Sequence, residues 1–505
     1  MAGRFTRPID DPIWPGDSEA GMVFPTPTFT VFFALVLPCS WLLMRRPRLW
    51  RPFMIAASYV FYGAWDWRFV FLLAGSTVAN HGLAVTIHRA RPGRVRRWLL
   101  LGAVAGDLAL LGYFKYEGFF LTSTHNLAAM VGLDLPFSVA AVALPVGISF
   151  YTFHAISYLV DTYRGAYTPT SLAKFAVYLS FFPHLIAGPI SRPGEFLPQL
   201  DTPRDTRAVE SSRAFLLIAS GLVKKLVIAN ELATRIVDPV FNAPGQHSSL
   251  DVLVGVYGYA VQIWADFSGY TDIAIGLALL LGFRLPQNFN APYTAVSVTD
   301  FWSRWHMTLS RWLRDYVFMP MARRFAVGAG RATPREYLGV YASLVTTMLL
   351  AGLWHGAGWT FVVWGAILGF ALAGERALRD LRRARGLAAP APSFARRTVH
   401  RVLTFQVICF AWIFFRSPTL ASAAAVISGL FTNWGQGASL VTAGVLATIV
   451  AGLAWQAIPS RIGETVIARF SRLGLVPQAA SLAVALAATA AMGPEGVAPF
   501  IYFKF

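Results

Sequence analysis

Apolar segments long enough to cross a membrane recur along almost the whole chain. About 20 mostly apolar residues span the hydrocarbon core of a bilayer. The candidate segments are 28–44, 53–64 with 67–87, 98–114, 118–133, 139–160, 172–190, 212–230, 250–265, 270–283, 338–354, 358–374, 400–416, 438–456 and 478–492. Several are short or contain Gly and Pro, so some must be re-entrant segments or half-helices, and we predict about 11 to 13 crossings.

The composition agrees with this pattern. Of the 505 residues, 56% are hydrophobic and 13% are charged, whereas about 25% of the residues of a soluble domain are charged. We therefore predict an all-α, multi-pass protein of the cell (inner) membrane, embedded in the lipid bilayer and with re-entrant or interfacial helices among its crossings.

The net charge of +18 comes largely from basic residues gathered in short clusters between the apolar segments. The clusters lie at 44–51, 88–97, 322–335 and 376–401. Basic loops of membrane proteins face the cytoplasm, so the charge indicates topology and not nucleic-acid binding. The two cysteines, Cys39 and Cys409, lie in different apolar segments without metal-ligand spacing, and we expect neither a disulfide nor a metal site.

The chain divides into a polar extension, residues 1–21, and one membrane domain, residues 22–505. The extension lacks the order of a secretory signal and is too polar to span a membrane, so we expect it to be disordered and without chemistry. Within the domain we predict an interfacial or re-entrant segment at about 284–325, a histidine-containing helix at about 338–356, a basic loop at about 376–401 and a C-terminal helical group at 402–505.

His355 stands out because it interrupts an apolar stretch, "AGLWHGAGWT" at 351–360. No Lys, Arg, Asp or Glu occurs between residues 343 and 372. An ionisable side chain at membrane depth is costly and is a candidate for function. Gly352, Gly356 and Gly358 allow close approach of backbone or ligand. We therefore expect His355 to be catalytic or to bind substrate.

Residues 262–316 contain more polar and charged residues than a helix facing lipid tolerates. Asp266 and Asp272 lie in apolar surroundings and should face the protein interior. One interpretation gives them a structural role, bonded to backbone freed at Gly269 or paired with arginines such as Arg284 or Arg304. The other gives them a role in proton handling or substrate contact.

A loop at 283–293, rich in Pro and Asn, precedes an amphipathic helical segment with Thr299 or Asp300 as its N-cap. His306 lies in this segment and is open to a structural or a catalytic role. The neighbouring Trp and Arg residues predict a helix half-inserted at the membrane interface. They are Trp302, Trp305 and Trp312 with Tyr316, interleaved with Arg304, Arg311 and Arg314.

Five ordered blocks resemble the membrane-bound O-acyltransferase family, in particular the bacterial branch that includes the membrane subunit of alginate O-acetylation. They are "LPVGISFYTFHAISYLVDTYRG" (144–165), "FFPHLIAGPISRPGEFLPQL" (181–200), "DFSGYTDIAIGLALLLGFRLPQNFNAPY" (266–293), "DFWSRWHMTLSRWLRDYVFMP" (300–320) and "GLWHGAGWTFVVWGAILG" (352–369). The resemblance covers 22–505 and implies tilted helices around a central funnel. It makes His355 the catalytic histidine and gives His306 a function. "MPMARRFAVGAG" and Leu368 depart from many relatives, which leaves acceptor choice and partner docking open.

The resemblance implies a membrane O-acyltransferase. It would move an acyl group, in the first place acetyl, from cytosolic acetyl-CoA to hydroxyls of an extracytoplasmic polysaccharide or to a partner acetyltransferase outside the membrane. His355 would be the general base, and His306 would polarise the thioester carbonyl or orient the nucleophile. Residues that could line a tunnel or contact the donor are Trp354, Trp305, Asp266, Asp272, Asn288, Asn290, Arg304, Arg323 and Arg324, the last two toward the phosphates of coenzyme A.

Two other functions remain open. One is transfer of D-alanine to teichoic acid from a carrier-protein thioester, since the "RWHMTLS" wording is also close to that branch of the family. The other is a proton-coupled transporter or polysaccharide exporter, which buried Asp and His in broken helices would suit. No internal repeat relates the two halves of the chain, which counts against transport.

Overall fold

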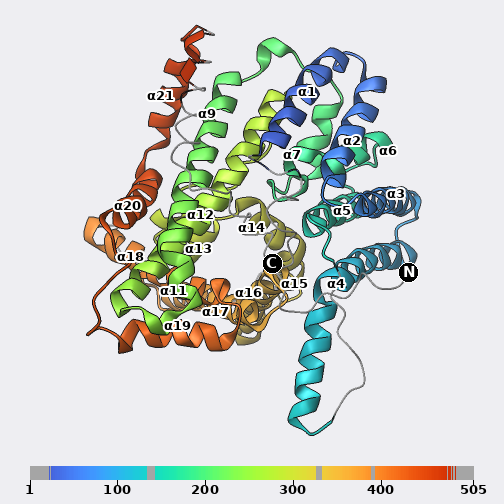
Figure 1. The fold of residues 1–505 in the computed structure, drawn as a ribbon. Coiled ribbons are helices and arrows are strands. Elements are labelled where there is room, and N and C mark those ends of the chain that lie inside the picture. Colours follow the sequence, from blue (N-terminus) through green and yellow to red (C-terminus); the bar gives the residue numbers. More distant parts are fainter. Residues whose placement is uncertain are drawn as a thin grey trace. The chain divides into compact units, whose positions relative to one another are not determined.

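The computed structural model describes residues 22, 24, 26–133, 143–325, 333–387, 393–474, 476–478, 480, 481 and 484. Across these residues the chain forms helices and connecting turns, without a β-strand (Figure 1). The all-α fold class is therefore confirmed. The prediction for residues 1–21 and most of the predicted span at 478–492 lie outside the described part.

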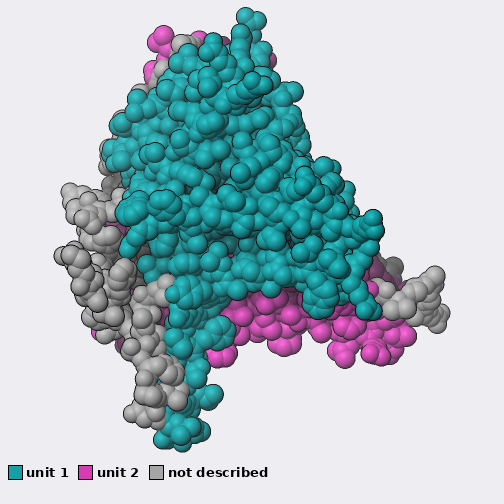
Figure 2. All heavy atoms as spheres, turned by 90° about the vertical axis from the view of Figure 1, so that its right-hand side faces the viewer, with its two compact units in different colours: residues 1–210, 277–285 teal, residues 211–276, 286–505 magenta. Residues whose placement is uncertain are grey.

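The helices belong to two compact units, which Figure 2 distinguishes by colour. One unit comprises Met1–Glu210 and Leu277–Leu285, and the other comprises Ser211–Gly276 and Pro286–Phe505. The long helix α12, Ser249–Leu280, passes from the second unit into the first. The first unit contains α1 (Pro27–Leu43), α2 (Pro47–Gly63), α3 (Arg68–Arg89), α4 (Arg94–Met130), α5 (Ile148–Tyr163), α6 (Leu172–Ser180), α7 (Phe182–Leu185) and α8 (Pro193–Phe196).

The second unit carries the residues of interest for function. Its helices are α9 (Ser211–Leu222), α10 (Asn230–Leu232), α11 (Asp238–Asn242), α12, α13 (Val298–Trp302), α14 (Met307–Leu313), α15 (Met319–Ala322), α16 (Pro334–His355), α17 (Trp359–Ala384), α18 (Phe394–Arg416), α19 (Leu420–Thr432), α20 (Ala443–Ala457) and α21 (Ser460–Ser471). π-Helical segments at Val223–Ala229, Ala233–Val237 and Arg314–Phe318 lie between some of them. Such segments interrupt the regular hydrogen-bond pattern and are frequent at functional sites.

Six helices in the described part are long and apolar enough to cross a membrane, and the total is seven if the bent pair Ala443–Ala457 with Arg461–Ser471 is one span. They confirm a multi-pass membrane protein. The shorter apolar helices α1 and α19 fall below that length, so the range of 11 to 13 crossings stays a prediction. Of the apolar window of α12, 89% is buried, against 17% for α4. Protein therefore surrounds α12, whereas α4 leaves most of its apolar surface for lipid.

Several predicted boundaries were wrong. The segments 98–114 and 118–133 form one helix, α4, and the segments 250–265 and 270–283 form most of α12. Gly269 does not end α12, because it serves close packing: a Cβ there would lie 2.7 Å from the carbonyl oxygen of Gly221. The predicted basic loop at 376–401 is mostly helical, since α17 continues to Ala384 and α18 begins at Phe394.

Helices α16 and α17 form a tightly packed hairpin, in which they lie side by side (Figure 1). A Cβ at Gly352 would lie 2.2 Å from the carbonyl oxygen of Phe361, and a Cβ at Gly365 would lie 2.4 Å from that of Met348. Small residues at such positions let helix backbones touch inside a membrane. The glycines of the "GLWHG" block therefore serve helix packing and fix the position of His355.

This packing predicts a large difference between two Gly to Ala substitutions on α17. Gly365→Ala should destabilise the protein by about 1–3 kcal/mol, because the new methyl group overlaps the α16 backbone. Gly374→Ala is the matched control, since a Cβ there meets nothing within 4 Å. It should be neutral or stabilising by up to about 1 kcal/mol. Thermal unfolding of the purified protein in detergent measures both, and equal melting temperatures would contradict the prediction.

Candidate active site

His355 is the last residue of α16 and is 2% exposed. The helix ends there because Gly356 adopts an extended conformation. Aromatic rings surround the imidazole: the ring centroids of Trp354, Trp364 and Phe415 lie 4.7, 5.1 and 5.2 Å from that of His355. His355 is therefore buried inside the protein, and its depth in the membrane stays a prediction.

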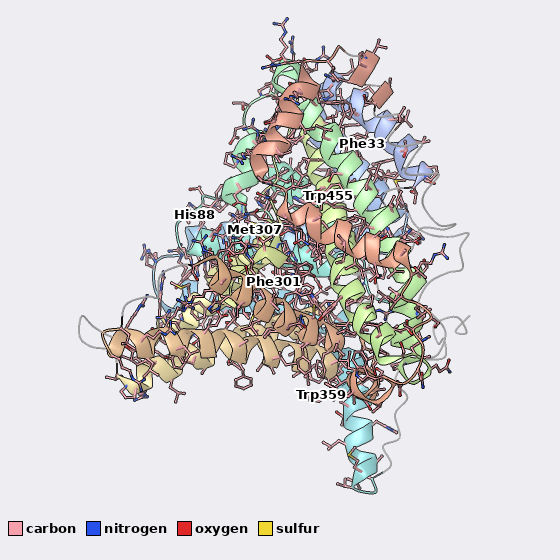
Figure 3. The ribbon with its side chains drawn as sticks, turned by 90° about the vertical axis from the view of Figure 1, so that its left-hand side faces the viewer. Phe33, His88, Phe301, Met307, Trp359 and Trp455 are labelled. Carbon is pink, nitrogen blue, oxygen red and sulfur yellow. The ribbon has the colours of Figure 1, made fainter. Side chains whose placement is uncertain are left out.

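His306 lies where the predicted amphipathic helix is broken. Helix α13 ends at Trp302, and α14 begins at Met307, with His306 between them in the left-handed region (φ 41°). Figure 3 labels Phe301 and Met307, which lie on either side of this turn. The prediction of one continuous helix was therefore wrong. A left-handed conformation is uncommon for a residue other than Gly and is found at functional sites.

Asn288 fixes the orientation and the tautomer of His306. The side-chain oxygen of Asn288 accepts hydrogen bonds from the backbone N–H of Thr308 (3.2 Å) and from its hydroxyl (2.8 Å). The same oxygen lies 3.1 Å from Nδ1 of His306, so Nδ1 must carry the proton in this bond. Nε2 of His306 consequently carries a lone pair. Burial lowers the pKa of His306 to about 3, so the ring is neutral at physiological pH.

The two histidines flank one indole. The ring of Trp354 lies 6.1 Å from that of His306 and 4.7 Å from that of His355. Both histidines are at most 2% exposed. The structure thus brings two residues that are 49 positions apart in the sequence against the same side chain. Trp354 is the predicted tunnel residue that forms this bridge.

Three buried N–H donors near these rings have no acceptor within the described residues. They are Nδ2 of Asn288 and Nε1 of Trp302 and Trp364. The rings of Trp302 and Trp364 lie 5.9 Å apart, and Trp364 also contacts His355. Buried polar groups are nearly always hydrogen-bonded. Donors of this kind around two buried imidazoles fit a site whose acceptor is a ligand oxygen.

Asp266 and Asp272 pair with lysines of the π-helical segment Val223–Ala229. Lys225 Nζ lies 2.6 Å from Asp266, with both side chains 5% exposed, and Lys224 Nζ lies 2.6 Å from Asp272. The predicted arginine partners are engaged elsewhere: Arg284 pairs with Glu210 and Arg304 with Asp300. The structural interpretation therefore gains support, with lysines in place of arginines. A role in proton handling stays a prediction.

The remaining predicted residues lie in different surroundings. Trp305 is fully buried against Phe301 and Trp412. Asn290, Arg323 and Arg324 are exposed. Trp305 therefore belongs to the aromatic core beside the histidines, whereas the other three remain candidates only on sequence grounds.

The tryptophans of the 298–322 segment point into the protein. Trp302 and Trp312 are 8% and 5% exposed, so the prediction of a half-inserted interfacial helix was wrong for this face. The physical reason is packing, since Trp302 contacts Trp364 of α17. The N-cap is Ser297, whose hydroxyl accepts from the N–H of Asp300, and not Thr299 or Asp300.

Sequence reasoning missed Lys224, Lys225, Trp364 and Phe415. A signal for the lysines was present, because "GLVKKLVIAN" at 221–230 places two adjacent charges inside an apolar segment. No such signal marks Trp364 or Phe415. They are two aromatic residues among many in apolar helices.

Comparison with known proteins places this site in a family. Residues 114–423 match the membrane-bound O-acyltransferase family. The chain is 40% identical to a probable alginate O-acetylase AlgI of Azotobacter vinelandii over 81% of this chain and 78% of that protein. It is 34% identical to a peptidoglycan O-acetyltransferase of Helicobacter pylori over 81% and 80%. A teichoic acid D-alanyltransferase of Streptococcus thermophilus is 29% identical over 45% of this chain and 55% of its own length.

The chain belongs to the membrane-bound O-acyltransferase family. It is an O-acyltransferase, and the resemblance of the five sequence blocks is confirmed. The two buried histidines and the N–H donors beside them therefore form a candidate active site for acyl transfer.

The hydrogen bonds of Asn288 predict that it positions His306. Asn288→Leu removes the acceptor for Nδ1–H, and kcat for acyl transfer should fall about 10- to 100-fold, the usual loss when an orienting partner of a functional histidine is removed. Asn290→Leu is the matched control, because Asn290 is exposed two residues away, and it should retain activity. Equal activities of the two variants, both folded, would show that Asn288 does not position the ring.

A second test separates a structural from a functional role of Asp266. Asp266→Leu leaves Lys225 buried without its partner and should cost about 3–5 kcal/mol of stability. The double variant Asp266→Leu with Lys225→Met should recover most of this loss, because both charges are gone. Detergent unfolding measures stability, and acyl transfer is assayed on the same samples. A stable double variant without activity would show that the pair serves the reaction and not only the fold.

Proposed function

We propose that this chain transfers an acetyl group from acetyl-CoA to a hydroxyl of an extracytoplasmic polysaccharide, directly or through an acetyltransferase partner outside the membrane. The observation that carries the proposal is the pair of buried histidines whose rings both contact Trp354, with unpaired N–H donors beside them in the described part. Acyl transfer needs a base for the hydroxyl and donors for the carbonyl oxygen, and this site offers both.

The reaction joins the acceptor oxygen to the thioester carbonyl carbon and breaks the carbon–sulfur bond. A sugar hydroxyl is a weak nucleophile near neutral pH, so a neutral imidazole must take its proton as attack begins. His355 is the proposed base, and it returns the proton to the leaving sulfur of coenzyme A. No net proton is gained or lost in this sequence.

The tautomer of His306 favours one of the two roles that the sequence suggested for this residue. Because Nδ1 donates to Asn288, Nε2 can accept a proton but cannot polarise a carbonyl. We therefore assign His306 to orienting the nucleophile, the second of the two roles the sequence suggested. The developing oxyanion would then be stabilised by the available donors, Nδ2 of Asn288 and the indole N–H groups of Trp302 and Trp364.

The relatives favour O-acetylation over D-alanylation. The similarity to proteins named as alginate and peptidoglycan O-acetylating enzymes covers 81% of the chain, whereas the similarity to the D-alanyltransferase covers 45%. The proposed acceptor is accordingly a cell-envelope or secreted glycan, and the proposed donor is acetyl-CoA. An extracytoplasmic acetyltransferase remains the proposed partner.

Substitution of the histidines tests the proposal. His355→Ala should abolish ester-linked acetyl on the target glycan, and His306→Ala should lower it by at least about tenfold, since a positioned base contributes about 10²–10⁴-fold. His88→Ala, which removes an exposed histidine, is the control and should have no effect. Mass spectrometry of envelope and secreted glycans gives the ester content at matched membrane abundance of each variant.

Full acetylation by His355→Ala would refute the base assignment. If the variant lost D-alanyl esters and not acetyl esters, the site assignment would stand, but the proposed donor and acceptor would be wrong. No change in any ester would contradict the proposed reaction as a whole.

A further inference from the structure

A cavity of about 420 Å³ lies between the ends of α17 and α18 and the start of α13. Four basic side chains line it: Arg379 and Arg382 from α17, and Arg396 and His400 from α18. None of these residues touches the two histidines of the candidate active site in the contacts described above. The cavity is therefore a separate feature that the acyl-transfer chemistry does not explain.

The cavity has an excess of positive charge, because its three lining arginines outnumber its one acidic lining residue, Glu375. Glu375 is engaged at the N-terminus of α13, where it accepts from the N–H groups of Val298 (2.6 Å) and Thr299 (3.0 Å). Within the described residues, Arg379, Arg382 and Arg396 form no ion pair. Neighbouring Asp380 pairs instead with Arg376 and Arg383, which do not line the cavity.

The other wall of the cavity is apolar and exposed. Leu378 and Leu403 are 63% and 57% exposed, and Val407 is 36% exposed. They lie where the charged ends of α17 and α18 give way to the apolar parts of these two candidate membrane spans. Such a boundary belongs at the level of the lipid headgroups, with the aliphatic side chains toward the acyl region.

The basic cluster at 376–401 also sets the side of the membrane. Loops rich in Lys and Arg face the cytoplasm, and the cytoplasmic leaflet carries the anionic lipids. A phosphate group offers oxygens that arginine binds through two parallel hydrogen bonds. Basic pockets between membrane helices on this side accommodate anionic headgroups. The positive charge, the cytoplasmic location and the apolar wall thus all favour an anionic lipid as the ligand.

We infer that the cavity binds the headgroup phosphate of an anionic phospholipid of the cytoplasmic leaflet. Arg379, Arg382 and Arg396 hold the phosphate, and the acyl chains lie along Leu378, Leu403 and Val407. This lipid docks the α17–α18 pair against the start of α13. Glu375 ties α13 to α17 at the same place, so the bound lipid stabilises the segment that leads to Trp302 and His306.

Native mass spectrometry of the purified full chain tests the inference. The protein is released from mixed micelles that contain equal amounts of phosphatidylglycerol and phosphatidylethanolamine. The wild type should retain at least about tenfold more phosphatidylglycerol, whereas R379Q/R382Q/R396Q should show no preference. The matched control R383Q/R397Q/R401Q removes the same charge from the same two helices, outside the cavity lining, and should retain the preference.

Equal retention of phosphatidylglycerol by the wild type and R379Q/R382Q/R396Q would overturn the inference. So would an equal loss in the two triple variants, because the effect would then be one of net charge. Displacement of phosphatidylglycerol by free coenzyme A would assign the cavity to the phosphates of the acyl donor instead. These measurements read binding alone, so their outcome does not depend on the proposed reaction.

Discussion

The backbone contact between α16 and α17 is the constraint on which the rest of the site depends. Gly352 and Gly365 have no side chain to separate the helices, so carbonyl oxygens of the opposite helix occupy the space of a Cβ. This approach brings Trp364 of α17 against His355 at the end of α16. Without it, the imidazole of His355 would lose one of the aromatic rings that shield it from solvent.

The low dielectric of a membrane protein interior imposes the second condition. Charged groups must be paired there, as Lys225 and Asp266 are. Titratable groups that have no partner of opposite charge are favoured in their neutral form. Asn288 satisfies His306 with a neutral acceptor and so selects a tautomer without adding charge. A carboxylate at this position would stabilise the imidazolium and raise the pKa of the ring, so Nε2 of His306 would be protonated more readily.

Much of the architecture could be read from the sequence. The apolar segments predicted a helical membrane protein, and the charge-free surroundings of His355 predicted its burial. The break at His306 could not be read, because the segment has helical propensity and only tertiary contacts with Asn288 and the aromatic core favour a left-handed residue there. The role of Gly269 was missed for a related reason: a glycine in a helix signals a break as readily as a close contact, and only the neighbouring helix decides which.

The proposed site requires that the imidazole of His306, held by Asn288, is neutral inside the protein at physiological pH. Solid-state ¹⁵N NMR of protein labelled on its nine histidines tests it most directly, with the His306 signals assigned by their loss in His306→Ala. We expect a neutral ring protonated at Nδ1 from pH 6 to pH 8, because burial holds the pKa of His306 at about 3. An imidazolium signal, or a ring protonated at Nε2 alone, would contradict it.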